Sequence, residues 1–234
     1  MDMAPTALLR GAIDMTTACA WLETIDAHPA WQRRGDGDAH SFNLHSSSLR
    51  LAAVPGLDAA IVAGMLLRGE ARAFCENRLG DALACDLDQC WIRRQYAPQR
   101  YPPGHAPHAW HQDGALAFDF LRQPPGEGAD GLLKMVTCWI ALTPCGDDAP
   151  GLELARVETT ALLAPHALQD AASANALERP VMAAGDCLVF GGGVLHHTHV
   201  APTMRSDRTS LEIRLFDANR LPARLRGDRF VTVH

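Results

Sequence analysis

The hydrophobic pattern divides the chain into two parts. In the first part, apolar residues recur at three- and four-residue spacing over residues 5–30 and 57–79, which predicts two helices. The second helix would begin near Asp58 and stop at Gly80, because Asp is a common N-cap and Gly a common helix terminator. Residues 1–89 are therefore expected to be mainly helical and to support a core that follows them.

In the second part, apolar residues come in short runs rich in Val, Ile, Trp and Phe, separated by turns rich in Pro and Gly. These runs predict strands at 90–96, 115–121, 132–142, 152–158, 181–190 and 209–216, with one helix at 165–178. Short strands preceded by helices fit a mainly β fold, a double-stranded β-helix (jelly roll, cupin-like) with helical support. We expect a single domain over 1–234, with the jelly-roll core at 90–216 and a C-terminal extension at 217–234.

Composition limits the compartment and the partners. The 234 residues are 47% hydrophobic and 21% charged, which is ordinary globular usage. A net charge of −6 argues against nucleic-acid binding, which depends on clustered basic residues. The chain has a single lysine, Lys134, so its positive charge is carried almost wholly by arginine, which suits carboxylate recognition. Seven cysteines without a CxxC pair favour a reducing cytoplasm over a disulfide framework. We expect no signal peptide, because the start of the sequence lacks a basic segment followed by a long apolar run. We expect no membrane segment, because the most apolar run, 59–67, is too short to cross a bilayer.

The candidate chemistry starts in "HAWHQDGALAFDF" at 108–120. Alternate side chains of a strand share a face, so His111 and Asp113 should point the same way, about 7 Å apart along the backbone. A third ligand is expected from "GDCLVFGGGVLHHTHV" at 185–200, where a Gly-Asp turn opens a buried strand, three glycines break it and three histidines follow. Two imidazoles and one carboxylate suit Fe(II) and leave coordination positions open.

Three segments together resemble the phytanoyl-CoA dioxygenase-like group of iron(II)/2-oxoglutarate-dependent oxygenases: "WHQDG" at 110–114, "GDCLVFGGGVLH" at 185–196 and "RTSLEIR" at 208–214. The resemblance runs from about residue 90 to 216. It implies three iron ligands, His111, Asp113 and His196, the last closing the "GD…LH" strand. His197 and His199 are the alternatives for the third ligand. The three-histidine, three-glycine loop departs from the single histidine that the family more often shows.

The resemblance also implies a binding site for the far carboxylate of 2-oxoglutarate. Arg208 lies at the expected distance after the distal histidine, and Ser210 shares its strand face. A guanidinium can bind a carboxylate with two charge-assisted hydrogen bonds, and the serine hydroxyl can add another. Arg205 and Arg214 are competitors, and Arg214 has the same strand parity as Arg208.

The activity implied by the resemblance is that of a non-haem dioxygenase that uses Fe(II), O2 and 2-oxoglutarate as cosubstrate. It would release succinate and CO2 and hydroxylate a small or medium organic molecule, such as an amino acid, an acyl compound or a natural product. Halogenation is disfavoured, because Asp113 fills the position that halogenating relatives leave to a halide. The alternatives are a cupin-like metalloenzyme without 2-oxoglutarate, with His108 or His199 as a fourth ligand, and a non-catalytic binding protein. Substrate identity and oligomeric state leave no signal in the sequence.

Several other residues near these motifs are expected to have ordinary structural roles. His105 and His108 are expected to face solvent or substrate, and Trp110, Phe118 and Phe120 to pack in the core. Glu153 and Lys134 are expected at the surface, and Cys138 and Cys187 are expected to be buried.

Overall fold

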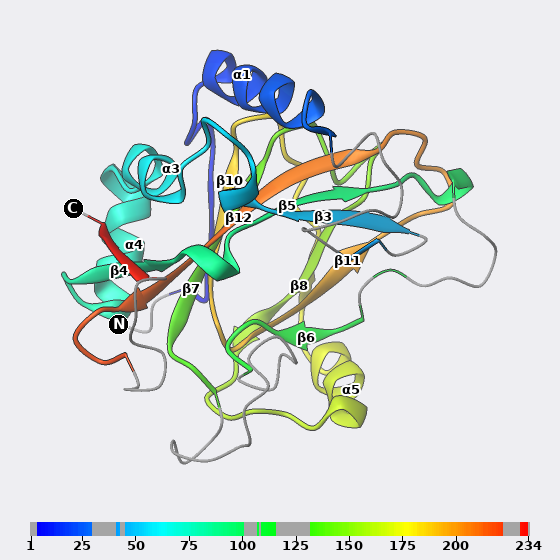
Figure 1. The fold of residues 1–234 in the computed structure, drawn as a ribbon. Coiled ribbons are helices and arrows are strands. Elements are labelled where there is room, and N and C mark those ends of the chain that lie inside the picture. Colours follow the sequence, from blue (N-terminus) through cyan, green and yellow to red (C-terminus); the bar gives the residue numbers. More distant parts are fainter. Residues whose placement is uncertain are drawn as a thin grey trace.

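Two antiparallel sheets pack against each other in the structure (Figure 1), a computed structural model that describes residues 4–29, 41–42, 45–100, 107, 109–115, 132–221 and 230–233. The larger sheet follows the order β1 (Thr6–Leu9), β10 (Cys187–Gly191), β7 (Met135–Ala141), β12 (Arg208–Asp217), β5 (Trp91–Gln95), β3 (Ser46–Arg50) and β2 (Ser41–Phe42). Two further strands, β4 (Leu83–Asp86) and β13 (Phe230–Val233), extend it beside the end of β12. The smaller sheet follows the order β6 (His111–Gln112), β11 (Val194–His199), β8 (Gly151–Glu158) and β9 (Leu177–Glu178). This is the expected mainly β jelly roll.

Helices cover the outer faces of both sheets. Three of them, α1 (Met15–Asp26), α3 (Ala59–Leu66) and α4 (Gly69–Leu79), lie on one side of the larger sheet, and α5 (Leu168–Ser173) lies beside the smaller one (Figure 1). Short 3₁₀ turns occur at η1 (Leu51–Ala53), η2 (Leu87–Gln89), η3 (Pro98–Arg100) and η5 (Pro165–Ala167). The main hydrophobic core lies between the three helices and the larger sheet, where Ile25, Phe74 and Ile213 belong to one buried cluster.

Strand β12 has an apolar face and a polar face, although it is buried along nearly its whole length. Leu211, Ile213 and Leu215 point outward into the helix-covered core. The alternate residues Arg208, Ser210, Glu212 and Arg214 are also buried and belong to the opposite face, toward the smaller sheet. Charged residues are seldom buried without a specific partner or role, so this inner face marks a candidate site.

The amino-terminal region differs from the helical prediction. Residues 5–30 form strand β1 before helix α1, because Leu8 packs inward against the smaller sheet while Leu9 packs outward under the helices. Pairing of β1 with β10 decides the conformation here, which local spacing cannot show. The predicted helix at 57–79 begins at the expected cap, Asp58, and ends before Gly80, but it is broken at 67–68 into α3 and α4.

Some strands of the sheets lie outside the range expected for the jelly-roll core. Strands β3 and β4 belong to the larger sheet, although they lie in the region predicted to be mainly helical. Strand β13 pairs with β4, so part of the expected C-terminal extension is sheet as well. The jelly roll therefore draws strands from both sides of 90–216. The strand predicted at 115–121 lies almost entirely outside the described residues.

The Gly-Asp turn that opens β10 is fixed by its contacts. Asp186 accepts hydrogen bonds from the amides of Gly11 (2.9 Å) and Ala183 (2.9 Å) and from the Arg10 guanidinium (2.7 Å). Gly185 has a φ of +88°, and a Cβ there would lie 2.2 Å from the Ile13 carbonyl oxygen. The turn therefore ties the segment between β1 and α1 to the start of β10.

The glycine run marks a change of sheet. We expected one strand to end at His196, but β10 ends at Gly191 in the larger sheet and β11 begins at Val194 in the smaller one. A Cβ on Gly193 would lie 2.0 Å from the Thr159 carbonyl oxygen, so the backbone passes too closely for any side chain. His196 consequently lies within β11, and His199 is its last residue.

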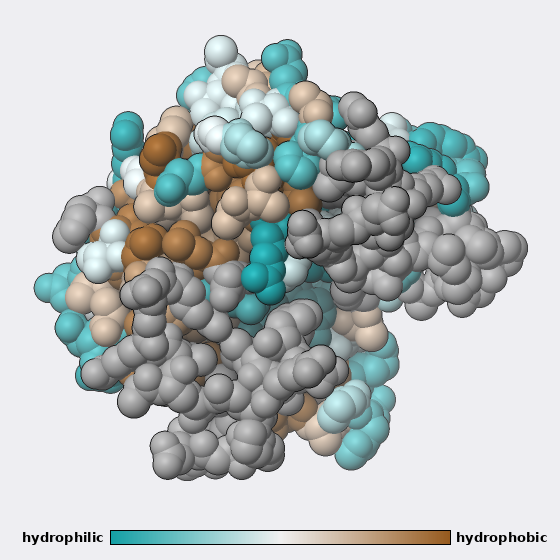
Figure 2. Space-filling view, viewed as in Figure 1, coloured by the Kyte–Doolittle hydropathy of each residue, from teal (hydrophilic) through white to brown (hydrophobic). Residues whose placement is uncertain are grey.

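The surface and the helices give two further observations. Figure 2 shows apolar side chains on the side of the molecule where α3 and α4 lie, and Ile61 of α3 is 63% exposed. Within the described ranges, no helix has the length and apolar character needed to cross a membrane.

Candidate metal centre and cosubstrate site

The structure brings His111, Asp113 and His196 together between the two sheets. One ligand atom from each lies within 4.8 Å of the others, which makes them a group that could hold a metal ion. His111 and His196 are opposite each other in the β6–β11 pairing, with ring centroids 4.1 Å apart. Asp113 Oδ1 lies 3.9 Å from His111 Nε2 and 3.8 Å from His196 Nε2. Both imidazoles thus present Nε2 toward one carboxylate oxygen, with space for a cation between them.

The histidine rings and the carboxylate are oriented by their second contacts. His111 Nδ1 lies 2.8 Å from the Ala109 carbonyl oxygen, and His196 Nδ1 lies 3.0 Å from that of Val194. A proton on Nδ1 would leave Nε2 free to bind a metal, as is usual for metal-binding histidines. The Thr137 hydroxyl donates to Asp113 Oδ2 at 2.6 Å, which leaves Oδ1 facing the imidazoles.

Burial alone would raise the pKa of Asp113, but nearby positive charge reverses the effect. The Arg214 guanidinium donates to Asp113 Oδ1 at 3.0 Å, and His196 and His111 also favour the ionised form. The net result is a pKa well below the usual range for aspartate. Asp113 is therefore a carboxylate at neutral pH and suitable for a divalent cation.

Arg208 lies in the wall of the same cavity and has no hydrogen-bond partner among the described residues. Its side chain is fully buried, and none of its three guanidinium nitrogens makes a hydrogen bond within the described part of the chain. The guanidinium lies over the Trp139 ring, 4.8 Å from the centroid, and burial lowers the pKa of Arg208 to about 10. Buried charges are normally paired, so this cation is suited to an anionic ligand.

Ser210 strengthens this interpretation. It is fully buried on the same face of β12, and its hydroxyl has no hydrogen-bond partner in the described part of the chain. The residue opposite on β7 is the small Ala141. A carboxylate bound there could satisfy the guanidinium and the hydroxyl together. The donors present fit 2-oxoglutarate, and the His-Asp-His group fits Fe(II).

The sequence model of the phytanoyl-CoA dioxygenase (PhyH) family matches residues 8–208. The chain belongs to this family. The family uses Fe(II), 2-oxoglutarate and O2, in agreement with the groups just described. A comparison with the curated proteins finds no match.

Solved structures of similar fold are iron and 2-oxoglutarate enzymes. The α-ketoglutarate-dependent carbocyclase SnoK from nogalamycin biosynthesis has 15% identity and a TM-score of 0.65, over 99% of this chain and 92% of SnoK. The epimerase SnoN, solved with Fe3+, α-ketoglutarate and nogalamycin RO, has 15% identity and a TM-score of 0.62, over 99% of this chain and 94% of SnoN. EctD from S. alaskensis, solved with 2-oxoglutarate and 5-hydroxyectoine, has 15% identity and a TM-score of 0.64, over 93% of this chain and 74% of EctD. At such identity these structures support the family's jelly-roll fold.

Arg205 and Arg214, the predicted competitors of Arg208 for the cosubstrate carboxylate, have other partners in this PhyH-family chain. Arg214 shares the face of Arg208, as expected, but its guanidinium is bound to Asp113 and lies 3.6 Å from Glu212. Burial lowers the pKa of Arg214, but Asp113 and Glu212 together raise it further, so the net shift is upward. Arg205 donates to the carbonyl groups of Pro202 and Met204 in its own loop. Arg208 remains the candidate for the cosubstrate.

A network of ion pairs that the sequence did not reveal lines the cavity. Arg93 lies 3.3 Å from Glu212, which faces Arg214, which in turn binds Asp113. The inward parity of β12 was a usable signal for Glu212 and Arg214. Their partners could not be found from sequence, because β5, β12 and the segment after β6 are far apart in the chain.

His197 and His199 do not belong to the metal-binding group found among the described residues. His197 has the opposite parity to His196, as predicted, and its Nε2 lies 2.7 Å from Glu153 Oε2. Burial lowers the pKa of His199, and Arg179, which also binds Glu153, adds to the effect. The expectation of a solvent-facing Glu153 was wrong, because it is only 5% exposed beneath these side chains.

The remaining expectations concern residues around the site. Trp110 is buried, Lys134 is exposed, and Cys138 and Cys187 are buried and free, as predicted. His105, His108, Phe118 and Phe120 lie outside the described residues.

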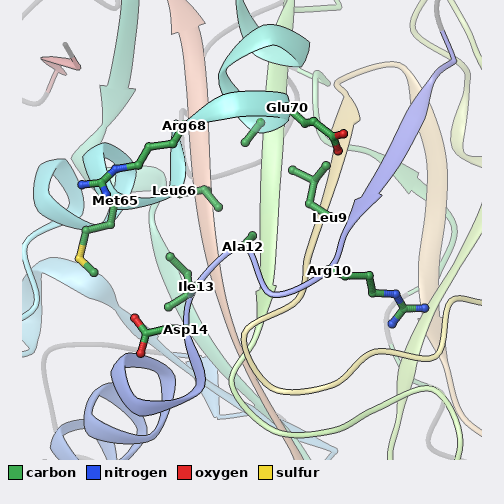
Figure 3. A pocket seen from close by; sticks show the side chains of 10 residues that line it. Leu9, Arg10, Ala12, Ile13, Asp14, Met65, Leu66, Arg68 and Glu70 are labelled. Carbon is green, nitrogen blue, oxygen red and sulfur yellow. The ribbon is translucent and has the colours of Figure 1, made fainter.

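A second cavity, of about 340 Å³, lies on the outer side of the larger sheet (Figure 3). It is bounded by the segment joining β1 to α1 and by the α3–α4 turn, with Ile13 and Leu66 among its apolar side chains. Two of its polar residues have structural partners, since Asp14 caps α1 and Arg10 binds Asp186, and Arg68 and Glu70 are exposed. Among the described residues, the outer cavity therefore has no buried donor without a hydrogen bond, unlike the inner one.

Proposed function

We propose that this protein is an Fe(II)/2-oxoglutarate-dependent oxygenase that hydroxylates a small or medium organic molecule and releases succinate and CO2. The observation that carries the proposal is the fully buried Arg208, which has no hydrogen-bond partner among the described residues and lies in the same cavity as the His-Asp-His group. A guanidinium without a counter-ion is costly in a protein interior, and a dicarboxylate bound to the metal would satisfy it with its free end.

The residues of the site have separate roles in this proposal. His111, Asp113 and His196 would hold Fe(II), and bound iron with 2-oxoglutarate supplies the activation of O2 coupled to decarboxylation of the cosubstrate. Arg208 and Ser210 bind the distal carboxylate and fix its orientation.

Three other residues prepare the cavity for this chemistry. Thr137 and Arg214 keep the Asp113 carboxylate ionised and oriented before metal binding. Phe190, whose ring centroid lies 4.7 Å from that of His196, excludes water from one side of the site. A dry cavity strengthens each of the charged contacts.

Hydroxylation is the proposed outcome, with desaturation or cyclisation as alternatives, since the similar folds include enzymes of other outcomes, a carbocyclase and an epimerase. Asp113 occupies its ligand position, which argues against halogenation. A cupin-like enzyme without 2-oxoglutarate would need another explanation for Arg208. His199, which we considered as its fourth ligand, is outside the metal-binding group.

Anaerobic titration of the apo-protein with Fe(II) and then 2-oxoglutarate tests the proposal. Chelation of the cosubstrate should produce a weak visible charge-transfer band, and the band should require a much higher 2-oxoglutarate concentration in Arg208→Met. Arg205→Met is the matched control, because Arg205 is exposed and, among the described residues, its side chain donates hydrogen bonds to carbonyl groups of its own loop, so the variant should titrate like the wild type. Fe(II) binding without a band, or an unchanged titration in Arg208→Met, would overturn the assignment of the cosubstrate site.

A further inference from the structure

The strand that carries one of the metal-binding histidines is short. β6 consists of His111 and Gln112 alone, and its two registered pairs are with β11. Among the strands that the structure describes, it is the outermost in the order of the smaller sheet. A two-residue edge strand has little pairing of its own to fix the position of His111 relative to His196.

Gln112, between the two ligands, is anchored by its side chain away from the metal group. It is buried, and its amide nitrogen donates to the Thr159 hydroxyl (2.5 Å) and to the Ala161 carbonyl oxygen (3.0 Å). Its amide oxygen accepts from the Leu163 backbone amide at 2.9 Å. One side chain therefore ties β6 to the segment that follows β8, through three hydrogen bonds.

A second contact joins β6 to β11 on the same side. The residues next to the two histidine ligands, Trp110 and His197, have ring centroids 4.3 Å apart. His197 is held in turn by Glu153, which is bound to Arg179 at 2.7 Å. Trp110 is also packed in a buried cluster with residues of β8, β11 and α5. The Trp110–His197 pair therefore lies on the opposite face of the two strands from the His111–His196 pair, and each pair brings the same two segments together.

We propose that Gln112 and the Trp110–His197 ring pair form a rear clamp that positions His111 against His196 for metal binding. This inference rests on the proposed function, because it assigns a purpose to the spacing of the iron ligands. The clamp residues do not touch the metal group's ligand atoms and act through the backbone of β6 and β11. Contacts that orient metal ligands typically change metal affinity by about 10- to 100-fold when they are removed.

Titration of the full-length apo-protein with Co(II), followed by the visible bands of the bound ion, measures the clamp without any need for turnover. Gln112→Met keeps the length of the side chain and removes its three hydrogen bonds, so its Kd for Co(II) should rise by about 10- to 100-fold. The matched control is Gln99→Met. Gln99 also donates its side-chain amide to backbone carbonyls, those of Pro202 and Met204, but away from the metal group. This control should bind Co(II) like the wild type.

The ring pair is tested by two substitutions at Trp110. Trp110→Leu keeps the site apolar but removes the aromatic contact, and it should raise the Kd and alter the Co(II) spectrum. Trp110→Phe retains an aromatic face for His197 and should restore much of the affinity. Urea unfolding of each variant separates a loss of global stability from a loss of ligand positioning, because only positioning changes the spectrum of a folded protein.

The outcomes distinguish this inference from the proposed function. If the wild type binds no Co(II), the proposed metal site fails and the clamp fails with it. If the wild type binds Co(II) and the folded Gln112→Met and Trp110→Leu variants bind it equally tightly with the same spectrum, the clamp is refuted while the metal site stands. A weaker site in both variants, with wild-type behaviour in Gln99→Met, supports the clamp.

Discussion

Replacing Arg208 by methionine should raise the stability of the protein without ligand and abolish its stabilisation by 2-oxoglutarate. Burial lowers the pKa of Arg208 from 12.5 to about 10, which corresponds to a cost of about 3 kcal/mol for keeping the charged form in the protein at neutral pH. Methionine removes this cost, but it also removes the contact with Trp139, worth about 1–2 kcal/mol, and fills the space less well. A net gain of about 1 kcal/mol remains, or roughly 2–4 °C in Tm for a chain of this size.

Ligand binding should reverse the order of stability. At a 2-oxoglutarate concentration 100 times its Kd, the wild type gains about 2.7 kcal/mol, which exceeds the gain from the substitution. The assay is thermal unfolding followed by circular dichroism, anaerobically with Fe(II), with and without 2-oxoglutarate. The variant should unfold at the higher temperature without the cosubstrate and the wild type at the higher temperature with it.

One set of unfolding temperatures would refute the reasoning behind this reversed order of stability. If Arg208→Met is several degrees less stable than the wild type without ligand and still gains stability from 2-oxoglutarate, the guanidinium has a structural partner and is not the anchor. Arg205→Met, at an exposed arginine, should leave both unfolding temperatures unchanged.

Two further predictions concern the Gly-Asp turn. Burial raises the pKa of Asp186, but the amides of Gly11 and Ala183 and the Arg10 guanidinium lower it further, so its stabilising effect is present above its ordinary pKa of 3.8 and lost as the pH falls below it. Asp186→Asn should lower the unfolding free energy by about 1–3 kcal/mol at pH 7, and urea denaturation should show the difference shrinking at acidic pH; a constant difference would contradict this. Gly185→Ala should lower the free energy of unfolding by more than the roughly 1–2 kcal/mol that a positive φ alone costs, because its Cβ would also clash with the Ile13 carbonyl. The control in urea unfolding is Gly56→Ala, at a position with a φ of +84° and nothing within 4 Å of its Cβ, and equal losses in the two variants would exclude the clash.

The sequence was informative where side-chain parity decides the geometry. Alternation predicted that His111 and Asp113 share a face, that His197 points away from His196, and that Arg208 and Ser210 lie together; the structure places them so. For the residues of β11 and β12 these are local properties of extended backbone, which need no knowledge of the rest of the fold. Asp113 faces the same site as His111 although β6 ends at Gln112 and Asp113 lies in the turn that follows.

The sequence was uninformative where distant segments meet. The strand character of β1 comes from its pairing with β10, and the ion pair of Arg214 with Asp113 joins residues about 100 positions apart. The glycine run gave a signal that we took for an interruption of one strand. In the structure, the chain passes from one sheet to the other at these glycines, and the Thr159 backbone lies too close to Gly193 for a side chain there.

The two-faced character of β12 also couples assembly of the site to correct folding. Arg208, Ser210 and Arg214 alternate with Leu211 and Ile213, so a one-residue slip against β7 or β5 would place leucines in the cavity and charges under the helices. No slipped form could keep both the hydrophobic core and the proposed cosubstrate anchor. An insertion or deletion of a single residue in this strand would therefore remove stability and ligand binding at the same time, and 2-oxoglutarate binding can report that the central strand has folded in its native register.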